Sequence, residues 1–260
     1  MLRSLLAVFL ASGLMTPAAQ APVGPDLPTV RVAAASDLKF ALDEAAARLR
    51  KDQPSIVVQP TYGSSGNIHS QLRQRAPFDL FLSADVDYPR DLVSRDIGTQ
   101  HDLFIYAIGR IVLWVPNSSR LPIERDGLGT LEMAERIAIA NPLHAPYGKA
   151  AEAAMRKAGV WERASRALVL GENVTQAAQF VHSGAADIGI IAKSLAVAPS
   201  MRDAGRFWEI PASYYTPLIQ GGLILPWATN RAAAERVRDY LLSDSGRALL
   251  AARGFDVPAR

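Results

Sequence analysis

The sequence predicts an α/β protein with two mainly parallel sheets, arranged as two lobes. Short β-type runs alternate with helical patterns along the 260 residues, as in proteins with parallel sheets. Two extended segments with few helical signals, Phe104–Val115 and Tyr214–Leu225, would carry the chain from one lobe to the other and back. The length and the 49% hydrophobic content are enough for one large domain or two lobes.

Strands and helices alternate regularly in the first part of the chain. Thr29–Ala34 reads as a strand, and the apolar residues between Leu38 and Leu49 recur at helical spacing on one face. The following segments read in turn as strand, helix and strand: Ile56–Thr61, Ile68–Arg75 and Phe78–Ser83.

The central part of the chain continues this alternation. Three further strands are predicted at Arg136–Ala140, Ala167–Leu170 and Asp187–Ala192. Helices are predicted at Lys149–Lys157 and from Val174 to Val181, each following one of these strands.

The two crossover segments predict a discontinuous first lobe. Lobe I would contain residues 22–107 plus 226–260, and lobe II residues 108–225 with the crossover strands. Two lobes joined by two strands form a hinge, and closure about a hinge around a ligand is the usual motion of such a molecule.

The N-terminus has the pattern of a secretory signal peptide. Arg3 precedes an apolar run, and small residues end at Ala19-Gln20-Ala21, so cleavage is expected after residue 21. A membrane anchor would need about 20 consecutive apolar residues, and Pro17 interrupts this run early. The mature chain is therefore expected in the periplasm.

Composition excludes several classes of function. The chain has no cysteine, so it has neither a disulfide framework nor a thiolate metal site. The net charge of +3 comes from scattered basic residues, which give no footprint for nucleic acid. The four histidines never show the i, i+4 spacing of a helical metal site, and we expect no cofactor.

Polar residues and glycines gather where four predicted helices begin. These junctions are Ala35-Ser36-Asp37, Tyr62 to Asn67, Asn141 to Gly148 and Gly171 to Val174. A helix start offers unpaired N–H groups and a partial positive charge, so it can bind an anion without any lysine or arginine. Ordinary helix capping explains a single junction equally well. Position in the chain alone does not show that the four converge.

Several motifs, in order along the chain, resemble those of the periplasmic molybdate-binding proteins of ABC importers. The matching stretches are Ala33–Leu38, Tyr62–Gly66, Ala76–Asp85, Tyr106–Trp114, Ala140–Pro142, Ala145–Gly148 and Gly184–Gly189. The resemblance covers nearly the whole mature chain. It implies a two-lobed periplasmic binding protein of the type II-like architecture that captures molybdate or tungstate. It also implies delivery to a membrane permease with a cytoplasmic ATPase, by a monomer that is not an enzyme.

The resemblance also implies a set of ligand-binding residues. The family's two serine ligands fall on Ser36 and Ser65, with the backbone N–H of Asp37 next to the first. The donors from the other lobe are main-chain N–H groups at Tyr147 and Val174.

Two positions depart from the family pattern. Ala192 stands where some members have a tyrosine hydroxyl ligand. Asp37 stands where a subgroup has asparagine, and a carboxylate beside a dianion is unfavourable unless it points away to cap its helix.

Three alternative functions stay open at this stage. Phosphate carries a proton that the Asp37 carboxylate could accept, and sulfate would have to be rejected by size. An organic anion would usually be fixed by a bidentate arginine, but no arginine lies at the four junctions. A hydrolase could be built from Ser64 or Ser65 with His69 and Asp79 or Asp85, but no serine lies in a G-x-S-x-G motif.

Overall fold

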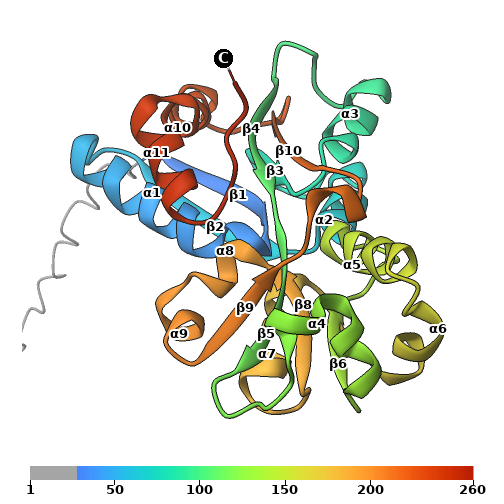
Figure 1. The fold of residues 1–260 in the computed structure, drawn as a ribbon. Coiled ribbons are helices and arrows are strands. Elements are labelled where there is room, and N and C mark those ends of the chain that lie inside the picture. Colours follow the sequence, from blue (N-terminus) through green and yellow to red (C-terminus); the bar gives the residue numbers. More distant parts are fainter. Residues whose placement is uncertain (1–27, 260) are drawn as a thin grey trace, which may run out of the picture.

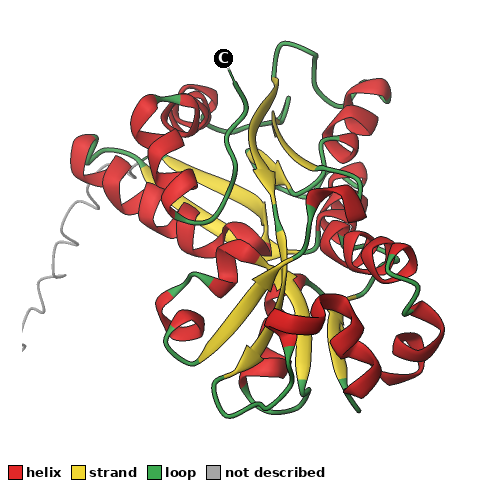
Figure 2. Cartoon of the chain, in the orientation of Figure 1, coloured by secondary structure: helices red, strands yellow, loops and turns green. Residues whose placement is uncertain are grey.

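Two five-stranded sheets with helices on their faces make up the fold in the computed structural model, which describes residues 28–259 (Figures 1 and 2). The first sheet has the strand order β2-β1-β3-β10-β4, and the second has the order β7-β6-β8-β5-β9. We call the first sheet with its helices lobe I and the second sheet with its helices lobe II. The α/β, two-sheet prediction is confirmed.

Lobe I is built around the strand β1, which is buried almost throughout. Its strands are β1 (Thr29–Ala35), β2 (Val57–Gly63), β3 (Leu80–Ser83), β4 (Leu103–Gly109) and β10 (Leu218–Ile224). Alternate side chains of a strand face opposite sides of the sheet. Val30 and Val32 accordingly pack with one group of helices, and Ala33 packs with another.

The helices of lobe I cover both faces of this sheet. α1 (Lys39–Asp52), α10 (Arg231–Leu242) and α11 (Asp244–Ala252) supply the apolar residues on the face of Val30. α2 (Ser65–Arg73) and α3 (Asp87–Ser94) cover the other face through Ile68, Leu72 and Leu92. The C-terminal helices therefore belong to the same layer as the N-terminal one (Figure 1).

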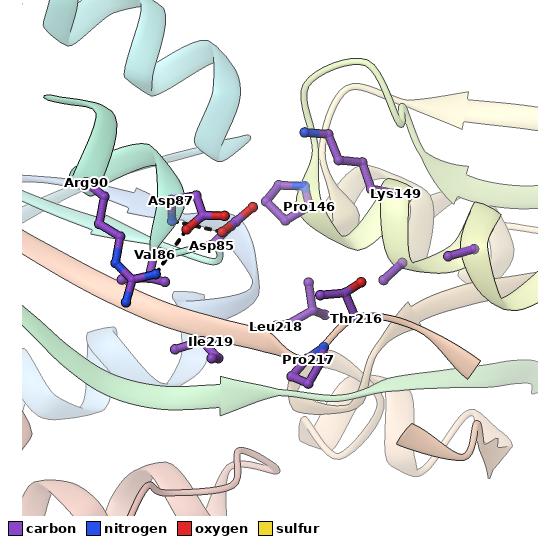
Figure 3. Close-up of a pocket in the computed structure, with 12 residues that line it drawn as sticks. Asp85, Val86, Asp87, Arg90, Pro146, Lys149, Thr216, Pro217, Leu218 and Ile219 are labelled. Carbon is purple, nitrogen blue, oxygen red and sulfur yellow. Dashed lines mark hydrogen bonds and ion pairs between the residues drawn. The ribbon is translucent and has the colours of Figure 1, made fainter. Parts of the chain in front are cut away.

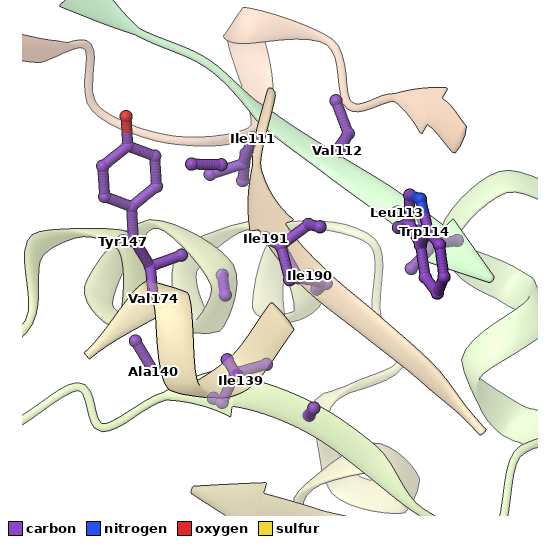
Figure 4. Packing of buried hydrophobic residues seen from close by; sticks show 14 of the residues in the cluster. Ile111, Val112, Leu113, Trp114, Ile139, Ala140, Tyr147, Val174, Ile190 and Ile191 are labelled. Atoms are coloured by element: carbon purple, nitrogen blue, oxygen red, sulfur yellow. The ribbon is translucent and has the colours of Figure 1, made fainter. Parts of the chain in front are cut away.

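Lobe II contains the largest apolar cluster, shown in part in Figure 4. Its strands are β5 (Ile111–Pro116), β6 (Ile137–Ala140), β7 (Leu168–Gly171), β8 (Ile188–Ala192) and β9 (Gly205–Glu209). Its α-helices are α4 (Ile123–Asp126), α5 (Pro146–Lys157), α6 (Trp161–Ala164), α7 (Val174–His182), α8 (Lys193–Ala196) and α9 (Pro199–Arg202). Short 3-10 helices lie at Ser36–Leu38, Gly127–Met133, Ser165–Ala167 and Ala212–Tyr214, and we call the first of them η1.

Two segments join the lobes. β4 ends at Gly109 and β5 begins at Ile111, so the outward path runs almost straight from one sheet into the other (Figure 1). The return path leads from β9 through Ala212–Tyr214 into β10, which pairs within the sheet of lobe I. The sequence assigned residues 108–225 to lobe II, yet β10 is hydrogen-bonded in lobe I. The exact lobe boundaries remain a prediction.

Both sheets are mixed, whereas the sequence predicted mainly parallel ones. In lobe I, β1 pairs in parallel with β2 and β3, but β10 pairs antiparallel with β3 and β4. In lobe II, β6 pairs in parallel with β7 and β8, but β5 pairs antiparallel with β8 and β9. The antiparallel pairs involve the crossover strands, which enter each sheet against the direction of its strand-helix-strand units.

Residues 28–259 contain neither a candidate membrane-spanning helix nor a candidate metal site. No helix in this part of the chain has the length and apolar character to cross a bilayer. No group of three or more His, Asp and Glu side chains in it could hold a metal ion. The predicted signal peptide, residues 1–21, lies outside the described residues.

Candidate functional site

Residues from all four predicted junctions line one small cavity between the lobes. Lobe I contributes the ends of β1, β2 and β3 with the starts of η1 and α2, and lobe II contributes the starts of α5 and α7. The cavity is small, with a volume of about 10 Å³. No lysine or arginine is among its lining residues, which are Ala35, Ser36, Asp37, Gly63, Ser64, Ser65, Ala84, Ala145, Pro146, Tyr147, Asn173 and Val174.

Ser65 reaches this cavity because α2 begins earlier than the sequence suggested. Ser64 is the N-cap, and its side chain accepts a hydrogen bond from the backbone N–H of Asn67. Ser65 is the first helical residue and is fully buried. Its Oγ accepts a hydrogen bond from the backbone N–H of Ala84 at 3.0 Å. A hydroxyl carries one proton and two lone pairs, so the proton of Ser65 remains available to a ligand.

Ser36 lies at the matching position after β1. Its Oγ accepts a long hydrogen bond of 3.4 Å from the backbone N–H of Thr175, and its carbonyl oxygen accepts one of 3.0 Å from the Thr175 hydroxyl. These contacts tie the end of β1 in lobe I to the first turn of α7 in lobe II. The hydroxyl proton of Ser36 again remains free to be donated.

The two helix starts of lobe II present backbone donors. α5 begins at Pro146, whose ring suits the first turn, and its N-cap Ala145 makes no side-chain cap. In α7 the cap Asn173 accepts from the N–H groups of Thr175 and Gln176. The first N–H groups of a helix have no partner within it. Tyr147 and Val174, both almost fully buried, stand at these positions.

The Asp37 carboxylate, whose orientation the sequence left open, does not form the N-cap of η1. η1 has Ala35 as its N-cap and no side-chain cap. The Asp37 carboxylate is buried, and its Oδ2 accepts hydrogen bonds from the Tyr147 hydroxyl at 2.9 Å and from Gln220 Nε2 at 2.6 Å. Burial raises the pKa of Asp37 to about 6, although these two hydrogen bonds and those from the backbone N–H groups of Asp37 and Leu38 act to lower it.

Two further hydrogen bonds join the lobes next to the residues that line the cavity. The backbone N–H of Gly66 donates to the carbonyl oxygen of His144 at 2.9 Å. The side-chain amide of Asn67 donates to Glu172 Oε1 at 3.3 Å. These contacts hold the starts of α2, α5 and α7 around the cavity.

A larger cavity of about 340 Å³ also lies between the lobes (Figure 3). Asp85, Asp87 and Arg90 face it from the start of α3, and Lys149 faces it from α5. Its two carboxylates repel an oxyanion beside the two cations, and of the four predicted helix starts only that of α5 lines this cavity. The smaller cavity is therefore the better candidate for binding a dianion.

The residues of the imagined hydrolase triad have other partners. His69 Nε2 lies 2.7 Å from Asp91 Oδ2, and the Asp79 carboxylate accepts hydrogen bonds from Arg31 and from the backbone of Thr229. Ser65 accepts from Ala84 rather than contacting His69. The described residues show no serine–histidine–aspartate arrangement among these side chains.

Sequence reasoning missed Gln220 and Ser194. Gln220 lies in β10 and is fully buried; the Ser194 hydroxyl, in α8, donates to the backbone oxygen of Asp37 at 2.8 Å. A lone glutamine in the apolar run Leu218–Ile224 is a signal that could have indicated Gln220. Nothing in the sequence around Ser194 pointed to Asp37.

Comparisons with known proteins agree with this architecture. The sequence matches the family described as bacterial extracellular solute-binding protein over residues 30–256. It is 32% identical to a molybdate-binding protein of Azotobacter vinelandii, with 97% of each chain covered. It is 33% identical to a molybdate-binding protein of Rhodobacter capsulatus, with 75% of each chain covered. The fold matches the solved periplasmic molybdate-binding protein of Azotobacter vinelandii with a TM-score of 0.81 and 29% identity, covering 88% of this chain and 100% of that one.

Proposed function

Because the chain belongs to the family of bacterial extracellular solute-binding proteins, we propose that it binds molybdate and supplies it to an ABC importer. Relatives named as molybdate-binding proteins, at 32% and 33% identity, support this ligand. The importer would consist of a membrane permease and a cytoplasmic ATPase. The signal-peptide pattern of residues 1–21 supports action of the mature chain in the periplasm. That the mature chain is a monomer is part of the proposal.

The single observation that carries the proposal is a small interlobe cavity with neutral donors and no cation. We assign the ligand contacts to the hydroxyls of Ser36 and Ser65 and to the backbone N–H groups of Asp37, Tyr147 and Val174. Helix starts stabilise a negative charge through their N–H groups and dipole. Donors supplied by both lobes would make ligand binding and lobe closure one event.

A set of hydrogen-bond donors favours a fully ionised oxyanion. A protonated anion would bury an O–H group without an acceptor, at a cost of about 1–3 kcal/mol. Molybdate and tungstate fit this requirement equally, so we include tungstate in the proposal. Sulfate meets the same requirement, and only its smaller size distinguishes it from molybdate.

Hydrogenphosphate is the second candidate ligand, and one observation favours it. Asp37 Oδ1 is buried and has no hydrogen-bond partner among the described residues. Such an oxygen is able to accept the proton of hydrogenphosphate.

Calorimetric titration of the mature protein with molybdate, tungstate, sulfate and phosphate tests the proposed function. We expect saturable heat with molybdate and tungstate, and little with sulfate or phosphate. Heat with phosphate alone would replace the proposal by the second candidate. Release of product from an ester substrate would instead indicate an enzyme.

Replacing Ser36 or Ser65 by alanine is expected to weaken molybdate binding by about 1–3 kcal/mol each, through loss of a charge-assisted hydrogen bond. Dissociation constants from the same titration measure the effect. Ser94→Ala in lobe I and Ser183→Ala in lobe II are matched controls, because these hydroxyls are exposed and bond only to nearby backbone oxygens. Unchanged affinity in both cavity variants would remove these hydroxyls from the site.

A further inference from the structure

Asp37, Tyr147 and Gln220 form a buried polar triangle behind the oxyanion cavity. Tyr147 and Gln220 both donate to Asp37 Oδ2, and Gln220 Nε2 also lies 3.2 Å from the Tyr147 hydroxyl oxygen. The three side chains come from η1 and β10 of lobe I and from α5 of lobe II. In Figure 4 the Tyr147 ring lies at the edge of the apolar cluster, with its hydroxyl directed away from it. The triangle therefore links the lobes through a single carboxyl group.

This triangle contains more acceptors than donors. Asp37 Oδ1 and Gln220 Oε1 are both buried and have no hydrogen-bond partner in the described part of the chain. Buried acceptors without donors are costly, and a buried charge without a counter-charge is more so. One additional proton on the carboxyl would remove the charge and supply a donor.

No cation in the surrounding elements balances the Asp37 charge. Lys39 of α1 pairs with Asp43, and Lys193 of α8 pairs with Glu209. The remaining titratable groups that face Asp37 are the hydroxyls of Tyr106 in β4 and Tyr147 in α5, and the pKa of each is raised far above 10, largely by burial. Tyr106 donates its hydroxyl to the carbonyl oxygen of Ser83. Asp37 is thus the group of this triangle that can change its charge near neutral pH.

Rotation of one side chain, the Gln220 amide, would give a proton on the Asp37 carboxyl a hydrogen-bond acceptor. A 180° turn of the Gln220 amide would place Oε1 where Nε2 now lies, 2.6 Å from Asp37 Oδ2. That separation is typical of an O–H···O hydrogen bond. The Asp37 O–H would then donate to Gln220 Oε1, which otherwise has no donor.

We propose that this triangle couples binding of the dianion to uptake of one proton by the Asp37 carboxyl. The inference rests on the proposed function, because a doubly negative ligand at Ser36 and Ser65 supplies the driving charge. The proton comes from solvent and forms an O–H bond on Asp37, and no other bond changes. Burial already raises the pKa of Asp37 to about 6, and a like charge beside it raises the pKa further. In the closed form without ligand, Asp37 is mostly ionised at neutral pH, whereas in the complex it is mostly protonated.

Titration calorimetry with molybdate in Tris and in Hepes at pH 7.5 measures this proton uptake. The buffers differ in ionisation enthalpy, so the difference in heat gives the number of protons bound. We expect uptake of up to about one proton per molybdate, and an affinity that falls with rising pH above about pH 6, by at most about tenfold per pH unit. Asp37→Asn should show no uptake and an affinity that is flat over the same range.

Tyr147→Phe gives an independent readout and keeps the backbone N–H of that residue. Loss of a hydrogen bond to the carboxylate should raise the pKa of Asp37 in the closed protein. The decline of affinity should therefore extend to higher pH than in the unchanged protein, a shift that a merely structural role would not produce.

Three results would overturn the inference in distinguishable ways. Molybdate binding without proton uptake in the unchanged protein would refute the coupling alone. Equal proton uptake by the Asp37→Asn variant would show that a group other than Asp37 takes up the proton. Absence of molybdate binding at every pH would refute the proposed function itself.

Discussion

Gly66→Ala is expected to weaken molybdate binding by about 2–4 kcal/mol, or roughly 30- to 700-fold. A Cβ at Gly66 would lie 2.6 Å from the carbonyl oxygen of His144 and 3.0 Å from its Cα. These are backbone atoms of the opposite lobe, so the lobes would have to separate. Separation breaks the hydrogen bond from Gly66 to His144 and withdraws the donors of α5 and α7. Titration calorimetry measures the loss.

The same substitution should leave the ligand-free protein stably folded. Gly66 is the second residue of α2, and alanine is a better helix former than glycine by about 1 kcal/mol. The melting temperature without ligand should be unchanged or slightly raised, whereas the increase on adding molybdate should be largely lost. Gly129→Ala is the matched control, since a Cβ there meets nothing within 4 Å. Wild-type affinity in Gly66→Ala would show that the contact between α2 and His144 does not govern closure.

Asp79→Ala is expected to lower the free energy of unfolding by about 2–4 kcal/mol, because loss of the buried carboxylate leaves backbone N–H donors without a partner. Asp79 is fully buried and ties together three segments of lobe I. It accepts hydrogen bonds from the backbone and side chain of Arg31 in β1, and from the backbone N–H of Thr229 before α10. Alanine would leave these donors without partners. Urea denaturation followed by circular dichroism measures the loss.

The pH dependence of this loss has a defined sign. Burial opposes ionisation of Asp79, but the hydrogen bonds from Arg31 and Thr229 outweigh it and lower the pKa of the carboxyl below 3.8. A lowered folded-state pKa stabilises the protein above the unfolded pKa, and this contribution disappears as the pH falls through the folded one. The difference between Asp79→Ala and the unchanged protein should therefore shrink in acid. Asp203→Ala, which removes an exposed partner of Arg202, should leave the melting temperature unchanged. Equal stability of the Asp79 and Asp203 variants would contradict this role.

Local sequence signals predicted the elements that surround the cavity. Ser64 and Asn173 cap α2 and α7, and Pro146 begins α5, as residues of these types do at helix starts. Convergence of the four junctions could not be derived from them, because it depends on how the lobes meet. The resemblance to a family supplied that expectation, and the cavity lining agrees with it.

The contacts of the Asp37 side chain could not be predicted from the sequence, for a physical reason. Gln220 is 183 positions away from Asp37, and Tyr147 is 110 positions away. The sheet of lobe I brings Gln220 to Asp37, and closure of the lobes brings Tyr147 to it, so local periodicity and capping rules carry no information about these contacts. The antiparallel pairing of β10 with β3 and of β5 with β8 could not be predicted either. It is set by the direction in which each crossover strand enters its sheet.

A crystal structure of the mature protein with molybdate, with the metal located by its anomalous scattering, tests the central claim most directly. Neutral donors of both lobes should surround the oxyanion. We expect its oxygens within hydrogen-bond distance of the hydroxyls of Ser36 and Ser65 and of the backbone N–H groups of Tyr147 and Val174. Molybdenum in the cavity beside Arg90 and Lys149, or bound to one lobe only, would contradict the account.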